Sequence, residues 1–347
     1  ELKRGKHLQG ISTHLKPFSR ERVTTDESWQ TFWDSLPAPR SAVDRYQLRQ
    51  LAGLNRPYMA RIGDNNNLPG RQAGILGAFY ESRRHLFSYE QHAADGSGFS
   101  LYANPVLGLN LHRSQEGEGL LYRNTRGVRL RGDVDQKLGF QFYLSENQAT
   151  FPQYIDAYAS DYGVIPNQGF IKRDGETFDF FNASGSVTFE ASQHIHLQFG
   201  HGDHFIGEGH RSLLKSDFGP NYLYLRGRAQ FGPIDYQSIF TQFTGEDISD
   251  PPYEQKYGAF HHLSIDITPS LELGLFESVI FSRSGNRGFR VQYLNPVIFY
   301  RYVDHQLGSP DNLLVGMNVD YMPFRRFQVY GQFVLDEFKI SEIRAGD

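Results

Sequence analysis

The chain contains no cysteine, which excludes disulfide bonds, thiolate metal sites and cysteine nucleophiles. It has no apolar run approaching the ~20 residues of a membrane-spanning helix, which excludes a helical membrane protein. No polybasic block is present and the formal net charge is only -4, so a nucleic-acid surface is not expected. Nucleophile-elbow, P-loop and dinucleotide-binding glycine motifs are also missing. The sequence therefore predicts neither catalytic residues nor a cofactor.

Aromatic residues and glycine are abundant instead. The 347 residues include 28 Phe, 20 Tyr and 35 Gly. Aromatic side chains favour strands, and glycine interrupts strands at turns and bulges. This composition indicates an all-β fold.

Alternation between apolar and polar residues is the main pattern of the chain. Leu223 and Leu225 share one strand face and Arg226 and Arg228 the other, because side chains two apart point the same way along a strand. About a dozen segments of about ten residues repeat this pattern. They lie at 75–90, 99–112, 119–134, 136–148, 181–189, 194–199, 222–229, 234–243, 262–267, 271–275, 313–321 and 327–333.

A soluble β-sandwich alternates in the same way, but two features favour a membrane barrel. The polar faces carry Arg, His, Gln, Asn and Gly, as a crowded polar lumen does. Aromatic residues gather near segment ends, where interface girdles lie. We therefore expect a large antiparallel transmembrane β-barrel of about 14–18 strands, with its apolar strand faces toward lipid.

The first 70 residues differ from the rest. Two short helical patterns between residues 24 and 53 predict a helical N-terminal extension over 1–70. The barrel is then expected over 71–347. Strand-like alternation is still running near Asp347, so we expect closing strands outside this numbering, because a barrel leaves no open edge in lipid.

Five potential metal ligands crowd into ten residues: His201, Asp203, His204, Glu208 and His210. Imidazole nitrogens and carboxylate oxygens are ordinary ligands for divalent metals. The cluster lacks the helical spacing of HExxH, and its glycines indicate a loop. We favour polar loop or lumen residues over a metal site.

Aromatic and arginine side chains form a candidate carbohydrate site. Pockets for such ligands combine aromatic faces with a few planar polar groups, and arginine also attracts acidic polymers. The alternative is that the arginines line a barrel wall and are neutralised by Asp and Glu opposite. The predicted ligand-binding residues are Arg129, Arg131, Arg211, Tyr222, Tyr224, Arg226 and Arg228.

Catalysis by a pair of carboxylates is a weaker alternative. Asp179, Asp235 and Glu277 have aromatic neighbours and can in principle serve a glycosidase. Nothing in the sequence brings two of them together. The glycosylation sequon at Asn182 falls inside a predicted strand, and a chance match explains it more simply.

Four stretches stand out from generic strands: NTRGVRLRGDV, LSENQATFPQY, GEGHRSLLKSDF and YLNPVIFYRYVDHQLGSPDNLLVG. Together they resemble the capsule-assembly Wzi-like family of outer-membrane proteins, and more closely its Bacteroidetes branch, which includes a gliding-motility protein. The resemblance covers about residues 100–340. Lys215 departs from the pattern, because an apolar residue is expected there. The residues that carry the family motif are Gly207, Gly209, Arg211, Ser212, Asn295, Pro296, Asp311 and Asn312.

The resemblance implies an outer-membrane β-barrel with a helical N-terminal piece, which acts as a surface lectin for capsular polysaccharide and has no catalytic residues. We therefore predict a non-enzymatic protein of the bacterial outer membrane that binds or organises surface polysaccharide. Its partners would be outer-membrane lipid, the polysaccharide and other envelope proteins, with no metal or cofactor. Two alternatives remain, a structural subunit of a gliding or secretion assembly and a soluble β-rich carbohydrate-active enzyme.

Overall fold

The computed structural model describes residues 15–16, 86–93, 97–113, 119–135, 137–244, 254–282, 291–295, 312–324 and 327–336. The helical patterns predicted between residues 24 and 53 lie outside these residues, and so do Pro296 and Asp311. Every predicted strand segment overlaps an observed strand, although residues 75–85 of the first segment lie outside the described residues, and the strand pairings among the described residues are antiparallel. The all-β prediction is confirmed.

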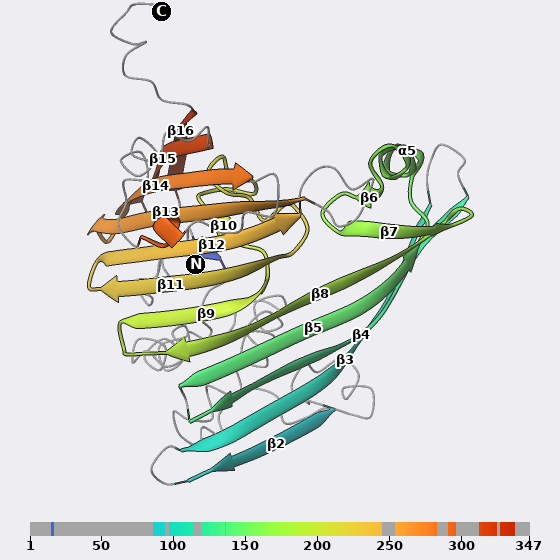
Figure 1. The fold of residues 1–347 in the computed structure, drawn as a ribbon, viewed down its shortest axis with the longest axis horizontal. Helices are drawn as coiled ribbons and strands as arrows, with labels where there is room; N and C mark the ends of the chain where they lie inside the picture. Colours follow the sequence, from blue (N-terminus) through green and yellow to red (C-terminus); the bar gives the residue numbers. More distant parts are fainter. Residues whose placement is uncertain are drawn as a thin grey trace, which may run out of the picture.

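The strands follow one another along the chain with a single α-helix among the described residues (Figure 1). Among these residues, no helix has the length and apolar character needed to cross a membrane. The elements are β1 (Leu15–Lys16), β2 (Phe87–His92), β3 (Gly98–Arg113), β4 (Leu120–Val134), β5 (Leu138–Ala149), α5 (Gln153–Tyr162), β6 (Val164–Ile165), β7 (Gly169–Asp174), β8 (Thr177–Glu190), β9 (Ile195–Gly202), β10 (Phe205–Ile206), β11 (Tyr222–Phe231), β12 (Ile234–Thr244), β13 (Gln255–Thr268), β14 (Leu271–Ser282), the 3-10 helix η2 (Val291–Leu294), β15 (Asn312–Phe324) and β16 (Phe327–Asp336).

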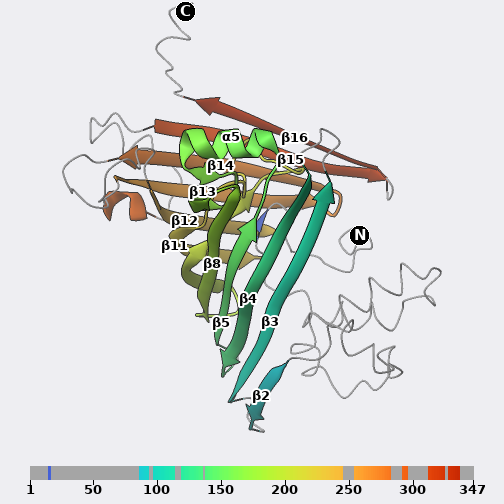
Figure 2. The same cartoon turned by 90° about the vertical axis from the view of Figure 1, so that its right-hand side faces the viewer.

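Nearly all strands belong to one sheet, ordered β16-β15-β14-β13-β12-β11-β9-β8-β5-β4-β3-β2. Strand β7 pairs with the first part of β8, and β9 pairs with its last part. The sheet twists and curves along its length (Figure 2). β2 and β16 are its end strands, and no pairing joins them among the described residues.

The connections at the two ends of the sheet differ in length. Short connections lie between consecutive strands at one end, at residues 93–97, 135–137, 191–194, 232–233, 269–270 and 325–326. The connections at the opposite end are longer, at residues 114–119, 150–176, 203–221, 245–254 and 283–311. The connection 150–176 contains α5, β6 and β7. We call these ends the short-turn end and the long-loop end.

The two faces of the sheet differ in polarity in the opposite sense to a soluble protein, because the apolar side chains are exposed and the polar side chains are buried. On β11, Leu223 and Leu225 are 40% and 43% exposed, whereas Arg226 and Arg228 are only 6% and 8% exposed. This confirms the prediction that the two sets lie on opposite faces. We call the face of Leu223 the outer face and the face of Arg226 the inner face.

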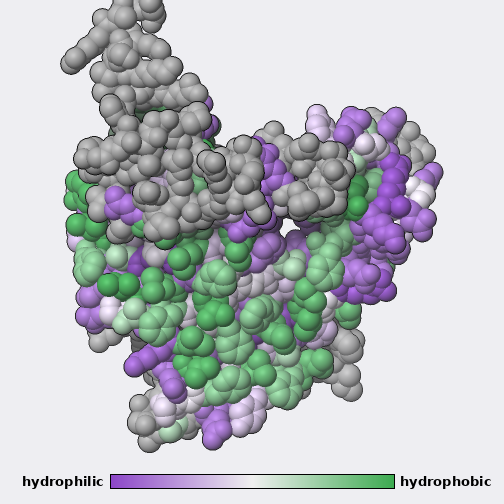
Figure 3. All heavy atoms as spheres, in the orientation of Figure 1, coloured by the Kyte–Doolittle hydropathy of each residue, from purple (hydrophilic) through white to green (hydrophobic). Residues whose placement is uncertain are grey.

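Neighbouring strands continue both faces, as their register shows. Figure 3 shows hydrophobic residues gathered over the strands, with hydrophilic residues around α5 and β7. The exposed apolar residues of the outer face include Val128, Leu138, Phe142, Leu144, Phe181, Val187, Phe189, Ile195, Leu197, Phe199, Leu223, Leu225, Ile234, Leu273, Leu275, Val315, Met317, Val329 and Phe333. The buried polar residues of the inner face include Ser145, Asn147, Ser186, Arg226, Arg228, Gln230, Asp235, Gln237, Thr241, His262, Ser264, Glu272, Asn318 and Asp320.

Candidate functional site

Residues 203–221, which we call the inner loop, connect β9 to β11 and fold back over the inner face. Ile206 and Leu214 of this loop are buried against Tyr222, Phe260 and other residues of β11–β14. Two backbone hydrogen bonds close the loop on itself, Ile206 N–H to Lys215 O at 2.9 Å and Lys215 N–H to Ile206 O at 3.2 Å. The inner loop is therefore part of the core and covers the polar face.

The tip of the inner loop contacts β16, the last strand of the sheet. Gln332 Nε2 donates a hydrogen bond to Glu208 O at 2.9 Å, and Leu213 N–H donates to Gln332 Oε1 at 2.7 Å. Ser212 Oγ also lies 3.3 Å from Gln332 Oε1. Because β12–β15 separate β11 from β16 in the sheet, the loop bridges two distant parts of its inner face.

Two glycines that the sequence analysis assigned to a predicted family motif make this bridge possible. Gly207 has φ 122° and Gly209 has φ 80°, a region that other residues rarely adopt. A Cβ on Gly207 would lie 2.1 Å from Ser212 Oγ and 2.7 Å from Gln332 Nε2. The motif residues Gly207, Gly209 and Ser212 therefore meet at the contact with β16.

The remaining motif residues lie elsewhere. The guanidinium carbon of Arg211 lies 4.8 Å from the ring centre of Phe218, on an exposed part of the inner loop. Asn312 begins β15. Asn295 follows η2, whose Tyr293 packs on outer-face residues of β13 and β14. The motif is thus divided between the two faces of the sheet.

Tyr222 and Tyr224, predicted to bind a ligand, are buried beneath the inner loop. The hydroxyl of Tyr222 lies 3.1 Å from Nδ1 of His204. The ring of Tyr224 meets that imidazole edge-on, with 4.2 Å between ring centres. Both tyrosines therefore anchor the loop on the sheet.

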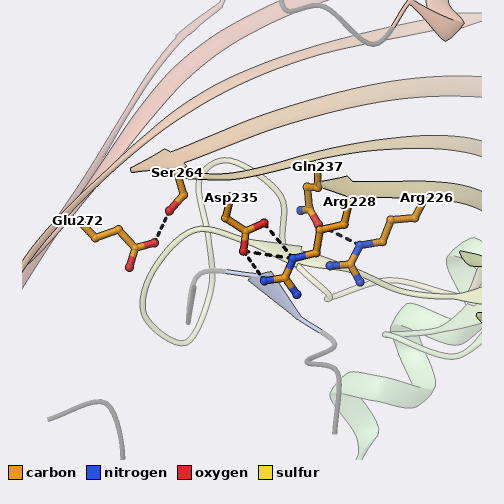
Figure 4. Close-up of polar contacts among 6 residues, drawn as sticks. All are labelled: Arg226, Arg228, Asp235, Gln237, Ser264 and Glu272. Atoms are coloured by element: carbon orange, nitrogen blue, oxygen red, sulfur yellow. Dashed lines mark hydrogen bonds and ion pairs between the residues drawn. The ribbon is translucent and has the colours of Figure 1, made fainter. Parts of the chain in front are cut away.

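Arg226 and Arg228 form a row of buried polar contacts with strand β12 (Figure 4). Arg226 Nε donates to Gln237 Oε1 at 2.9 Å. Arg228 Nε donates to both carboxylate oxygens of Asp235, at 2.9 and 3.1 Å, and its Nη2 forms an ion pair with the same group. Arg228 therefore fits the alternative interpretation, in which an arginine of the wall is neutralised by a nearby carboxylate.

Arg129 and Arg131 lie on the inner face of β4, in the part of the sheet beyond β9. Their guanidinium groups lie over the rings of Tyr143 and Tyr102, with distances of 5.4 and 5.5 Å from Cζ to the ring centres. Arg129 is exposed and Arg131 is half-buried. The structure does not join these two arginines to Arg226 and Arg228 in one site.

The histidine and carboxylate cluster of residues 201–210 does not converge. His201 is exposed on the outer face, where its Nδ1 lies 3.0 Å from Ala183 O, whereas His204 is buried under the inner loop. Among the described residues, no three His, Cys, Asp or Glu side chains are grouped as metal ligands. Of the carboxylates considered for catalysis, Asp235 lies on the inner face and Glu277 on the outer face. Asp179 lies on β8, and four strands of the sheet separate β8 from Glu277 on β14.

Lys215 and His204 meet at the inner loop in a role that the sequence analysis did not predict, since it named His204 as a potential metal ligand and Lys215 as a departure from the family pattern. Lys215 Nζ lies 4.6 Å from the ring centre of Tyr222 and 5.3 Å from that of Phe260. Burial lowers the pKa of Lys215 to about 8, although Asp203 and Asp217 oppose this shift. Burial, together with nearby Arg226 and Lys215, holds the pKa of His204 well below its ordinary value. The break in the apolar pattern at Lys215 was the signal for this site in the sequence.

No protein-family model matches the chain, and no curated protein matches it in sequence. The inverted faces, the unequal connections and the inner loop are therefore the basis for a functional assignment.

Proposed function

We propose that this chain forms a transmembrane β-barrel wall in the bacterial outer membrane and binds surface polysaccharide without catalysing a reaction. The observation that carries the membrane assignment is the inverted polarity of the sheet. Burying a Leu, Val or Phe side chain contributes about 1.5–3 kcal/mol relative to leaving it in water. Soluble monomers rarely expose apolar patches beyond a few hundred Å². Lipid is the medium that suits the exposed apolar residues gathered on the outer face.

The buried polar residues of the inner face support the same proposal. A polar group that is buried without a partner is costly, so such groups form internal networks. Here Ser264 Oγ donates to Glu272 Oε1 at 2.5 Å, and His262 Nε2 lies 2.9 Å from Asn318 Oδ1. A polar interior of this kind is typical of outer-membrane barrels.

The unequal lengths of the connections indicate how the proposed barrel would be oriented in the membrane. Outer-membrane barrels have short periplasmic turns and longer extracellular loops. The short-turn end would therefore face the periplasm, and the long-loop end, with α5, would face the exterior. The contacts of the inner loop begin from this exterior side, because β9 ends and β11 begins there.

Three exposed tyrosines on α5 are the best candidates for contact with polysaccharide at the long-loop end. Tyr154, Tyr158 and Tyr162 are spaced four residues apart, so they form a stripe along the helix. The rings of Tyr158 and Tyr162 lie 4.6 Å apart. Arg173 fixes the helix, because its guanidinium group contacts Asp156 and donates to Ser160 Oγ at 2.7 Å. Aromatic faces beside polar groups suit sugar rings.

Two measurements test the proposal separately. The membrane assignment requires the protein to stay with the outer membrane after salt washing and to extract only with detergent. Extraction without detergent would instead favour the soluble enzyme. Polysaccharide binding is tested on a glycan array with detergent-purified protein and the double variant Tyr154→Ala/Tyr158→Ala. Loss of binding in that variant, with binding kept in the outer-face control Tyr321→Ala, is the expected result.

A membrane protein without glycan affinity would overturn the polysaccharide part alone. In that case, co-purification with other envelope proteins after mild detergent extraction would favour a structural subunit of an outer-membrane assembly. Binding that is equally weakened by Tyr321→Ala and by the α5 variant would exclude the tyrosine stripe as the contact surface.

A further inference from the structure

The junction between the inner loop and β11 contains a buried histidine with an unused nitrogen. His204 is 1% exposed, and its Nε2 has no hydrogen-bond partner among the described residues. The Tyr222 oxygen accepts a hydrogen bond from the backbone N–H of His204, so the hydroxyl hydrogen is available to donate to Nδ1. A neutral imidazole carries one proton. When the Tyr222 hydroxyl donates to Nδ1, that proton lies on Nε2, which is then a donor.

Lys215 supplies a second donor at the same junction. Its ammonium group lies over the rings of Tyr222 and Phe260. In the described part of the chain, it forms no ion pair and no side-chain hydrogen bond. The residue as a whole is half-buried, while burial of its ammonium group lowers its pKa to about 8, and its three N–H groups are donors when it is protonated.

Arg226 is the third residue at this junction that carries N–H donors. It is buried, and its Nε contacts the neutral amide oxygen of Gln237. Its charge and that of Lys215 both act on His204, which places the three side chains in one electrostatic neighbourhood. Guanidinium, ammonium and imidazole N–H groups all donate, and none of them accepts.

Two carboxylates face this junction from the inner loop, Asp203 and Asp217, and both act on Lys215. Neither forms an ion pair with Lys215 among the described residues, and the Asp203 side chain is exposed. Asp235, the nearest carboxylate of β12, is bound by Arg228. Asp203 and Asp217 offset part of the positive charge at the junction, but neither removes the donor groups of Lys215 and His204.

We propose that the junction binds a compact oxyanion, a phosphate or a carboxylate, through Lys215 and His204 Nε2, with the charge of Arg226 contributing to its attraction. Charge-assisted hydrogen bonds from such groups are the usual means of holding phosphate or carboxylate oxygens. The anion can be free inorganic phosphate or a phosphate or carboxylate group attached to a sugar. The proposal depends on the inner face alone, so it stands or falls independently of membrane location and of the α5 tyrosines.

Titration of the purified full chain with inorganic phosphate tests the site, using ³¹P NMR line broadening and protection of Lys215 from amine acylation. We expect saturable binding that protects Lys215. Lys215→Met, which keeps the apolar stem, should weaken binding at least tenfold, whereas Lys215→Arg should keep it. The control Lys172→Met changes an exposed lysine on β7 and should bind like the wild type.

Parallel titrations with glucose 6-phosphate and with glucuronate distinguish the sources of the anion. Tighter binding of a sugar-linked group assigns the site to a glycan, and preference for inorganic phosphate assigns it to a free ion. Equal phosphate affinity in the wild type and Lys215→Met, or no protection of Lys215 by any of the three anions, would overturn the site. A folded Lys215→Arg variant guards against loss of binding through misfolding.

Discussion

Gln332 and Leu213 are joined by a hydrogen bond of 2.7 Å, although 119 residues separate them along the chain. The amide of Gln332 acts in both directions, because its oxygen accepts from Leu213 N–H and its nitrogen donates to Glu208 O. One side chain thus holds two sides of the inner-loop tip against β16.

Substitution Gln332→Ala should release the tip of the inner loop. Each lost hydrogen bond costs about 0.5–1.5 kcal/mol, so removing the two bonds should raise the open fraction of the loop by about 5-fold to 150-fold. Limited trypsin digestion measures this as faster cleavage after Arg211. Gln328→Ala is the matched control, since Gln328 also lies on β16 but donates to Asp320 on β15. Equal cleavage rates in the two variants would contradict the role of Gln332.

Breaking the buried contact between Arg228 and Asp235 should destabilise the sheet strongly. Arg228→Met leaves a buried carboxylate without its partner, which typically costs about 3–5 kcal/mol. The double variant Arg228→Met/Asp235→Asn should recover part of this loss, because no charge is left alone. Thermal unfolding in detergent measures both effects. Arg126→Ala, which removes the exposed pair with Glu146, should change stability by less than about 1 kcal/mol.

A charge on the outer face should interfere with membrane insertion. Leu225→Arg places a cation on the apolar face of β11 and should cost about 2–4 kcal/mol if that position lies near the middle of the bilayer. Refolding into lipid vesicles, followed by protease protection, measures the effect. Leu213→Arg introduces the same change at an exposed position of the inner loop and serves as control. A fully inserted Leu225→Arg variant would argue against lipid at this face.

Lys215 should titrate near pH 8, because burial lowers its pKa to about 8. Its acylation rate should therefore reach half of its maximum near that pH, as measured by mass spectrometry against a reference peptide. Between about pH 8 and 10.5 the unfolded chain binds more protons than the folded chain, so stability should rise with pH. Lys215→Met should abolish this part of the rise. A midpoint near the ordinary lysine value would contradict the burial of the ammonium group.

The strands and the identity of their faces could be predicted because alternation is a local property. Leu225 and Arg226 occupy opposite faces in any strand that contains both. The path of the inner loop could not be predicted in this way, because its contact with Gln332 depends on where β16 lies. The role of Lys215 also needed the structure, since the aromatic rings that accept its ammonium group come from β11 and β13.

Helix α5 was missed because it is short and has little apolar character. Only Ala159 is fully buried on it, against Phe178 and Phe180 of β8. Its limits depend on Pro152 before the first turn and on Gly163, which has φ 67° and donates to Ala159 O. Isolated helices of this length are marginal in water, so tertiary packing decides whether the helix forms. The sequence of ten residues does not reveal that packing partner.

The link between the inner loop and β16 also sets an order of folding. Joining Leu213 to Gln332 across a disordered chain would cost about 4 kcal/mol of loop-closure entropy, which the hydrogen bonds of one glutamine do not offset. The link can persist only after β11–β15 have paired and brought β16 into position. The inner loop therefore docks on β16 late in folding, after strands β11–β16 have paired. Until then, the interior charges of β11 and β12 remain hydrated.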